Sequence, residues 1–152
     1  IVSSSCFEHA EMFWLLFLEI LRVLKPEGLF YLNAPANGEF HRYPVDCYRF
    51  YPDAGAALAR WGRRNGFPAL CLESYVGNQA DGHWNDFVAV FLADERHLAR
   101  HPHRILHGFD LVPGTVVEST PTGTAPLLTM WSTVVEGPVA PMIDDAAFCK
   151  AA

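Results

Sequence analysis

The stretch from Ser3 to Pro35 limits the possible folds of this chain more than any other part of the sequence. It opens with three serines and continues as a long amphipathic segment that ends in the turn sequence Lys-Pro-Glu-Gly. A second apolar run, Leu29 to Ala34, follows that turn. Strand, loop, helix, turn and strand in this order predict a βαβ unit with two parallel strands. Ligands of such sheets bind outside the carboxyl ends of the strands, so we expect the functional site near residues 3–9 and 34–37.

Two helices are predicted from apolar residues that recur every three or four positions. In the first helix, about Glu11 to Leu24, one face carries Phe13, Leu16, Phe17, Ile20, Leu21 and Leu24. Pro26 cannot continue that helix, and Gly28 gives the backbone freedom to turn after it. The second helix extends from about Pro52 to Asn65, because proline suits a first helical turn and Asn-Gly suits a helix end.

Other apolar runs extend the predicted sheet. Besides the strands at residues 1–4 and Leu29–Ala34, strands are expected at Ala69–Val76 and Asp86–Leu92. From Asp110 onward the sequence is rich in Pro, Gly and Thr without a clear period, and one strand is conceivable within Leu127–Val135. The sequence shows no internal repeat, and its 152 residues have the length of one domain.

The composition excludes several classes of protein. Apolar residues make up 51% and charged residues 18%, which is typical of a globular domain and not of a disordered chain. The net charge of -6 argues against a nucleic-acid surface, because phosphate binding needs concentrated positive charge. The longest apolar stretch, Met12 to Leu24, is broken by Glu19 and Arg22 and is too short to span a bilayer. We therefore expect neither nucleic acid nor membrane as a partner and, with no signal peptide visible, a cytoplasmic location.

No disulfide framework and no metal site are expected. The four cysteines lack CxxC spacing; they are Cys6, Cys47, Cys71 and Cys149. Scattered thiols of this kind are typical of structural cysteines in a cytoplasmic protein. Residues 95–109 form a basic segment whose histidines stand four apart, His97 with His101 and His103 with His107. Pro102 interrupts the helix predicted there, and no HExxH motif occurs, so a surface helix is the favoured interpretation.

Several motifs resemble the carboxyl-terminal half of a class I S-adenosylmethionine (AdoMet)-dependent methyltransferase of the methyltransferase type 11-like family. The motifs, in the order and spacing of that family, are SSSCFEH at 3–9, RVLKPEG at 22–28, NAP at 33–35 and YPVDCYRFYPDAG at 43–55. The resemblance covers residues 1–94. It departs from the family at Glu27, which replaces the first glycine of the turn.

The resemblance implies an α/β fold, namely part of a Rossmann-like methyltransferase sheet with flanking helices. Strands four to seven of that sheet would be present, the last one antiparallel and inserted between strands five and six. Residues 86–92 would therefore lie between residues 29–34 and 69–76. Residues 95–152 would form a helical and irregular carboxyl-terminal extension to the domain at 1–94.

The resemblance also implies a missing amino-terminal half. No GxGxxG-like turn occurs in the sequence, so the glycine-rich turn and the acid that binds the ribose would lie outside these residues. A half-sheet has an open edge and an uncovered face. We therefore expect a poorly stable or self-associating chain, with partial exposure of Phe13, Trp14, Phe17 and Leu21.

The site that the resemblance implies has a donor side and an acceptor side. AdoMet would be the cofactor, its methionine part beside Ser4, Ser5, Cys6 and Phe7. The catalytic candidates, facing a small-molecule methyl acceptor, are Glu8, His9, His41 and Tyr43. A carboxylate suits the start of a helix, and a histidine that titrates near neutrality suits a general base. Alternatively, Glu8 caps the helix and His9 packs beneath the loop.

The loop at residues 36–51 has a second interpretation as well. A long irregular link at the carboxyl edge of a sheet is usually functional, and in the family this region helps to wall the acceptor pocket. Alternatively, three aromatic residues pack the loop onto the sheet; these are Tyr48, Phe50 and Tyr51. Asp46 and Arg49 are expected to fix a turn, because loop charges more often do so than take part in chemistry. His83 and Trp84 are expected at an exposed loop tip.

Three functions stay open at this point. The first is a parent AdoMet-dependent methyltransferase, of which these residues alone would be inactive. The second is a non-catalytic methyltransferase-like domain that serves as a binding or scaffold module. The third is another α/β protein with a nucleotide ligand. The acceptor, its target atom and the oligomeric state cannot be predicted from the residues.

Overall fold

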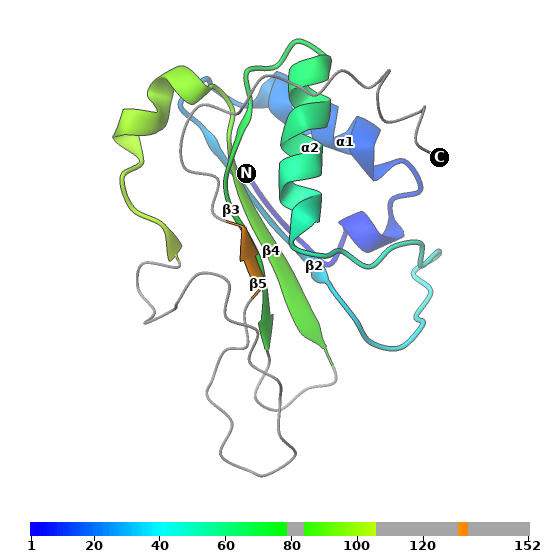
Figure 1. Cartoon of the computed structure of the whole chain (residues 1–152). Coiled ribbons are helices and arrows are strands. Elements are labelled where there is room, and N and C mark those ends of the chain that lie inside the picture. The colour runs from blue at the N-terminus through cyan, green and yellow to red at the C-terminus, as the bar shows by residue number, and fades with distance from the viewer. Residues whose placement is uncertain (79–83, 106–130, 134–152) are drawn as a thin grey trace, which may run out of the picture.

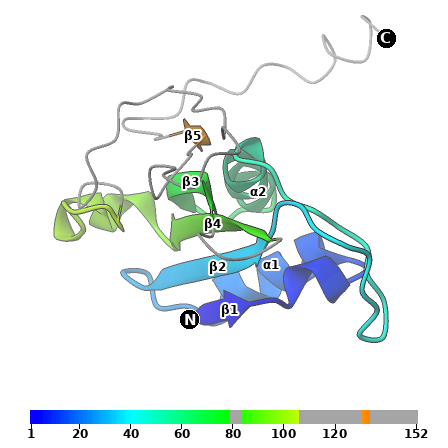
Figure 2. The same ribbon diagram turned by 90° about the horizontal axis from the view of Figure 1, so that it is seen from below.

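The computed structural model describes residues 1–78, 84–105 and 131–133. Five strands form one sheet, and two α-helices cover one of its faces (Figures 1 and 2). The strands are β1 (Val2–Ser4), β2 (Leu29–Pro35), β3 (Leu70–Asn78), β4 (Asn85–Leu92) and β5 (Trp131–Thr133). The α-helices are α1 (Phe13–Val23) and α2 (Asp53–Arg64), and two 3-10 helices are η1 (Phe7–His9) and η2 (Glu95–Arg100).

The sheet is mixed, and its strand order is β1-β2-β4-β3-β5. β1 and β2 are parallel, with Ser4 opposite Asn33. β4 lies between β2 and β3 and is antiparallel to both. The expected α/β class, the parallel first pair and the inserted antiparallel strand are thus confirmed. β5 adds to the outer edge of β3, within the stretch where a strand was conceivable.

The main core fills the space between the sheet and the two α-helices. Phe30 on β2 and Phe91 on β4 are stacked, with ring centroids 5.8 Å apart, and Phe17 of α1 meets Phe91 edge-on at 4.8 Å. The expected exposure of Phe17 and Leu21 is wrong, because they are 0% and 4% exposed. Helix α2 covers both, and its Gly62 brings the backbone so close that a Cβ there would lie 2.8 Å from Leu21 Cδ1.

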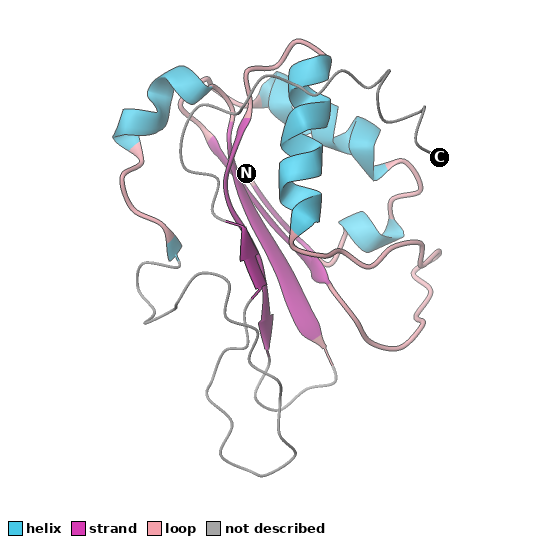
Figure 3. Ribbon diagram, in the orientation of Figure 1, coloured by secondary structure: helices cyan, strands magenta, loops and turns pink. Residues whose placement is uncertain are grey.

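Helix α1 is shorter than predicted and starts after a separate turn (Figure 3). Glu8 and His9 belong to η1, and Ala10 after them is extended, so they do not open the long helix. The packing of Phe7 explains this break, because its fully buried ring lies 5.8 Å from Phe30 and 6.2 Å from Phe13. A turn of 3-10 helix directs that ring inward before α1 begins.

The second face of the sheet is covered in part by η2 and the residues after it (Figure 2). Leu98 of η2 packs on an apolar cluster formed by Leu70, Leu72, Val90 and Leu92. The backbone N–H of Ile105 donates to Glu73 Oε1 at 2.9 Å. The segment that was expected to be a helix broken at Pro102 is thus a 3-10 helix; His107 lies outside the described residues. None of the described helices combines the length and the apolar composition that crossing a membrane requires.

Candidate functional site

An open cleft of about 460 Å³ lies where β1 ends, at the carboxyl edge of the parallel pair. It is lined by Ser5, Cys6, His9, Ala10, His41 and Tyr43. Residues from two distant segments therefore meet here, the turn after β1 and the loop after β2. Five of the eight residues predicted for the site line this cleft.

The backbone at the start of the cleft turns sharply. Ser5 has a φ of 50°, in the left-handed region that residues with a side chain rarely adopt. Its N–H donates to the carbonyl of Asn33 at 3.1 Å, and the hydroxyl of Ser4 donates to Asn33 Oδ1 at 3.2 Å. Asn33 on β2 thus holds the turn that follows β1. Uncommon backbone conformations of this kind are concentrated at functional sites.

Three of the predicted residues, Ser4, Phe7 and Glu8, are not among those that line the cleft. Phe7 is fully buried in the core, so only its backbone is available to a ligand. Ser4 bonds to Asn33 and is not among the lining residues. Tyr43 does line the cleft, but its side chain is 84% exposed and makes the outer rim.

Glu8 is buried beneath the cleft, with 1% of the residue exposed. Its Oε1 lies 3.7 Å from Nε2 of His9. Among the described residues, Oε2 has no hydrogen-bond partner. The alternative that Glu8 caps the long helix is wrong, because Glu8 lies in the first turn of η1 and α1 begins only at Phe13. A buried carboxylate oxygen without a partner is unfavourable, so its retention suggests a ligand.

His9 is held in one orientation by the loop after β2. Its Nδ1 contacts the carbonyl of Val45, and since a carbonyl only accepts, Nδ1 carries the proton. Nε2 then faces Glu8, and the side chain is 14% exposed. The expectation that His9 packs beneath the loop is confirmed, but the ring also lines the cleft.

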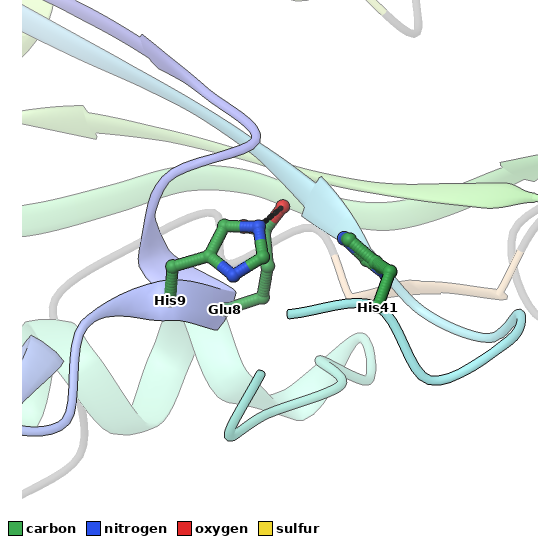
Figure 4. Close-up of side chains that lie close together, drawn as sticks. All are labelled: Glu8, His9 and His41. Carbon is green, nitrogen blue, oxygen red and sulfur yellow. Dashed lines mark ion pairs between the residues drawn. The ribbon is translucent and has the colours of Figure 1, made fainter. Parts of the chain in front are cut away.

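His41 approaches the same point from the opposite wall (Figure 4). Its ring lies edge-on to the ring of His9, with centroids 4.9 Å apart. Its Nδ1 is 3.1 Å from the carbonyl of Glu39, which leaves Nε2 for the cleft. One ligand atom from each of Glu8, His9 and His41 lies within 4.8 Å of the others. We call these three residues the Glu8 cluster.

An ion pair shapes the loop that carries His41. The carboxylate of Asp46 is 1% exposed, accepts the backbone N–H of His41 at 2.7 Å, and pairs with both terminal nitrogens of Arg49. The Arg49 guanidinium, with these hydrogen bonds, holds the pKa of Asp46 well below its usual range, and the carboxylate in turn raises the pKa of Arg49. Arg49 also donates to the carbonyl of Glu39. The expectation that Asp46 and Arg49 fix a turn is confirmed.

Trp84 belongs to the site, although an exposed loop tip was expected. Its ring lies edge-on to His41 at 4.9 Å, and the Arg49 guanidinium lies 5.7 Å from the centre of the same ring. Gly38 permits this contact, because a Cβ there would lie 2.0 Å from a Trp84 ring carbon. His83 lies outside the described residues. The sequence signal for Trp84 was weak: a tryptophan next to a strand, opposite a glycine in a distant loop.

The loop aromatics differ in their environment. Phe50 is buried at 3% exposure, and the hydroxyl of Tyr48 donates to the carbonyl of Glu11 at 2.9 Å, so both pack the loop onto the domain. Tyr51 is 68% exposed and does not pack the loop onto the domain. The packing interpretation is therefore correct for Tyr48 and Phe50 and wrong for Tyr51.

Chemically, the cleft presents two imidazoles and has a buried carboxylate beneath it; these are the groups most often used for proton transfer and for metal binding. Cys6 adds an exposed thiol at the rim.

Comparison of the chain with models of protein families, with curated proteins and with solved structures finds no match. The function must therefore be argued from the cleft itself.

Proposed function

We propose that this chain forms the acceptor side of an AdoMet-dependent methyltransferase that acts on a small molecule. The observation that supports the proposal most directly is the convergence of Glu8, His9 and His41, of which His9 and His41 line the cleft beside the turn after β1. The resemblance of residues 3–9 and 22–28 to that family gives the reaction class. The cleft supplies the groups that such a reaction needs on the acceptor.

The donor would lie beside Ser4, Ser5, Cys6 and Phe7, chiefly against backbone atoms. Ser5, in the left-handed conformation, and Cys6 line the cleft at this point, so backbone groups of the turn would be near a donor bound there. Methyl transfer is an in-line displacement, so donor and acceptor must be held collinear. The walls of the cleft, from Cys6 on one side and Tyr43 on the other, would hold the two together.

His9 would accept the proton of an acceptor hydroxyl or amine. Its Nδ1 is already bonded to the Val45 carbonyl, so Nε2 is the nitrogen that takes a proton. The bond from the acceptor oxygen or nitrogen to the methyl carbon forms as the sulfur–methyl bond breaks, which leaves S-adenosylhomocysteine. Glu8 at 3.7 Å would stabilise the imidazolium that results.

A cytoplasmic location is part of the proposal. The three cysteines in the described part of the chain, Cys6, Cys47 and Cys71, are free thiols. Free thiols are more usual in reducing compartments than in oxidising ones.

A non-catalytic binding module is the second candidate. The observation that favours it is the absence of a GxGxxG-like turn from the sequence, since that turn usually cradles the nucleoside part of such ligands. The buried Glu8 carboxylate argues the other way, because binding alone does not require a charged group without a partner.

Calorimetric titration with AdoMet tests the proposal. Two proteins are compared: the 152-residue chain and the product of the complete reading frame that contains it. Contacts to ribose and adenine supply much of the donor affinity, and each loss of about 1.4 kcal/mol weakens binding tenfold. We expect no saturable binding to the 152-residue chain and micromolar binding to the complete product, competed by S-adenosylhomocysteine. A complete product that binds neither compound contradicts the proposal.

A further inference from the structure

One ligand atom from each of Glu8, His9 and His41 lies within 4.8 Å of the other two, although Glu8 is only 1% exposed. Oε1 of Glu8 lies 3.7 Å from Nε2 of His9. Oε2 has no partner in the described part of the protein. Acceptors that converge with no donor between them are satisfied by a proton or by a cation.

The outer nitrogens of both imidazoles are already held. Nδ1 of His9 faces the Val45 carbonyl, and Nδ1 of His41 faces the Glu39 carbonyl at 3.1 Å and Asp46 Oδ2 at 3.6 Å. Metal-binding histidines almost always donate their second ring N–H to a carbonyl or a carboxylate in this way. The Val45 carbonyl assigns the proton of His9 to Nδ1, which leaves its Nε2 free to bind an ion, whereas Nδ1 of His41 also lies 3.5 Å from a terminal nitrogen of Arg49.

We infer that Glu8, His9 and His41 form a binding site for one divalent transition-metal ion at the base of the cleft. The inference departs from the expectation drawn from the sequence, which assigned no metal. It depends on the contacts of these three side chains and not on methyl transfer. An ion among them would pair the orphaned Oε2 and neutralise the buried carboxylate.

The ligands define the kind of ion. Two imidazoles and one carboxylate suit Zn²⁺, Mn²⁺, Fe²⁺ or Co²⁺, whereas Mg²⁺ and Ca²⁺ prefer oxygen ligands alone. Three protein ligands also leave coordination positions for water or for a ligand in the cleft, as in catalytic sites. Arg49 is a competing cation, because its charge interacts with that of Glu8 and its buried Nε has no hydrogen-bond partner among the described residues, but Asp46 already engages both of its terminal nitrogens.

The spacing fits a site that closes slightly on its ion. Ligand atoms around tetrahedral zinc lie about 3.4 Å apart, given bonds of about 2.0 to 2.2 Å. Glu8 and His9 are near that value at 3.7 Å, and the widest separation in the cluster is within 4.8 Å. His41 can supply the remaining movement, because it is carried by a loop and its side chain is 38% exposed.

A bound ion would also affect methyl transfer to the acceptor. This one consequence rests on the proposed function. A hydroxyl bound to a divalent metal loses its proton far more readily than a free one. The proton of an acceptor with an oxygen on the ion would then pass to solvent water, and His9 would act as a ligand and not as the base. Acceptors with a hydroxyl group would be favoured over amines.

Titration with Co²⁺, followed by visible absorption, tests the inference without any methyl donor. The 152-residue chain is first stripped of metal with EDTA. We expect one Co²⁺ per chain, displaced by Zn²⁺ and unaffected by an excess of Mg²⁺. Glu8→Gln and His41→Ala should each weaken Co²⁺ binding at least about tenfold. The matched controls, Glu19→Gln and His103→Ala on exposed positions, should bind Co²⁺ as the parent chain does.

Circular dichroism identifies variants that fail to fold. If Glu8→Gln fails to fold, His41→Ala decides the outcome, because His41 lies on the surface loop. Absence of saturable Co²⁺ and Zn²⁺ binding to the folded chain overturns the inference. Binding that is unchanged in His41→Ala overturns it as well, since the ion would then be held by other histidines. Neither outcome bears on AdoMet binding, so the failure of this inference and that of the proposed function are distinguishable.

Discussion

Oε1 of Glu8 lies 3.7 Å from Nε2 of His9, in a part of the molecule where the Glu8 side chain is 1% exposed. The second carboxylate oxygen has no hydrogen-bond partner among the residues that the structure describes. Burial of a charged group costs several kcal/mol unless it is paired, so a purely structural role would be better served by an apolar residue. The pair is therefore the centre of the proposed site.

Close packing between α2 and β3 makes Gly55 a sensitive position. A Cβ there would lie 2.4 Å from the Ser74 hydroxyl oxygen, which is buried and donates to the Pro52 carbonyl. We expect Gly55→Ala to lower the free energy of unfolding by about 1 to 2 kcal/mol, because overpacking outweighs the gain in helix propensity. Urea unfolding measures the change.

Gly62→Ala is the matched control in the same helix. Its Cβ would meet the flexible end of Leu21 at 2.8 Å, which can move aside. A loss for Gly62→Ala as large as that for Gly55→Ala would argue against backbone proximity to Ser74 as the cause.

Alkaline pH should destabilise the domain through the buried thiol of Cys71. Burial raises its pKa to about 12 from an ordinary value of 9.0. The folded state therefore holds this proton more tightly than the unfolded state does. The contribution of the Cys71 thiol to the free energy of unfolding is complete below about pH 9 and is lost as the pH rises toward about 12. Burial raises the pKa of Tyr75 as well, which acts in the same direction.

Urea unfolding at pH values between about 8 and about 11 measures this dependence. In Cys71→Ala we expect a weaker decline of the free energy of unfolding with pH than in the parent chain, while Cys6→Ala, at an exposed thiol, should leave the decline unchanged. Equal slopes for Cys71→Ala and the parent would show that the tyrosines alone cause the effect.

The sequence predicted the order of the elements well and the orientation of single residues poorly. Pro26 and Gly28 bound α1 as expected, since their backbone restrictions act locally. The insertion of β4 between β2 and β3 followed from the family resemblance and not from the residues. Periodicity says nothing about strand order, because an antiparallel and a parallel strand can carry the same apolar run.

The burial of Phe17 and Leu21 was missed because the expectation followed from a half-sheet with an uncovered face, whereas α2 packs over both side chains. In the site, Glu8 was found by its motif, but its unpartnered oxygen was not. Nor was the orientation of His9 and His41, which depends on the Val45 and Glu39 carbonyls of a loop of irregular structure. The direction of a backbone carbonyl in an irregular loop cannot be predicted from the pattern of side chains in a sequence.

The free edge of β1 should lead to self-association. Among the described strands β1 pairs with β2 alone, and Val2 at this edge is 73% exposed. We expect sedimentation velocity to show concentration-dependent association, and Val2→Lys to reduce it, because a charge on an edge strand opposes pairing between copies. A monomer at all concentrations with a sharp, concentration-independent thermal transition would contradict this expectation.

The central claim is that the Glu8 cluster faces a methyl acceptor. Transfer of labelled methyl from AdoMet to a low-molecular-mass metabolite extract, by the product of the complete reading frame, tests it most directly. We expect transfer, and Glu8→Gln and His9→Ala should reduce turnover at least about a hundredfold, as general base catalysis is worth about that much. The donor affinity of both variants should change less than turnover, and Glu19→Gln and His103→Ala should retain full turnover. Absence of transfer by a protein that binds AdoMet, or full turnover in both cluster variants, would contradict the account.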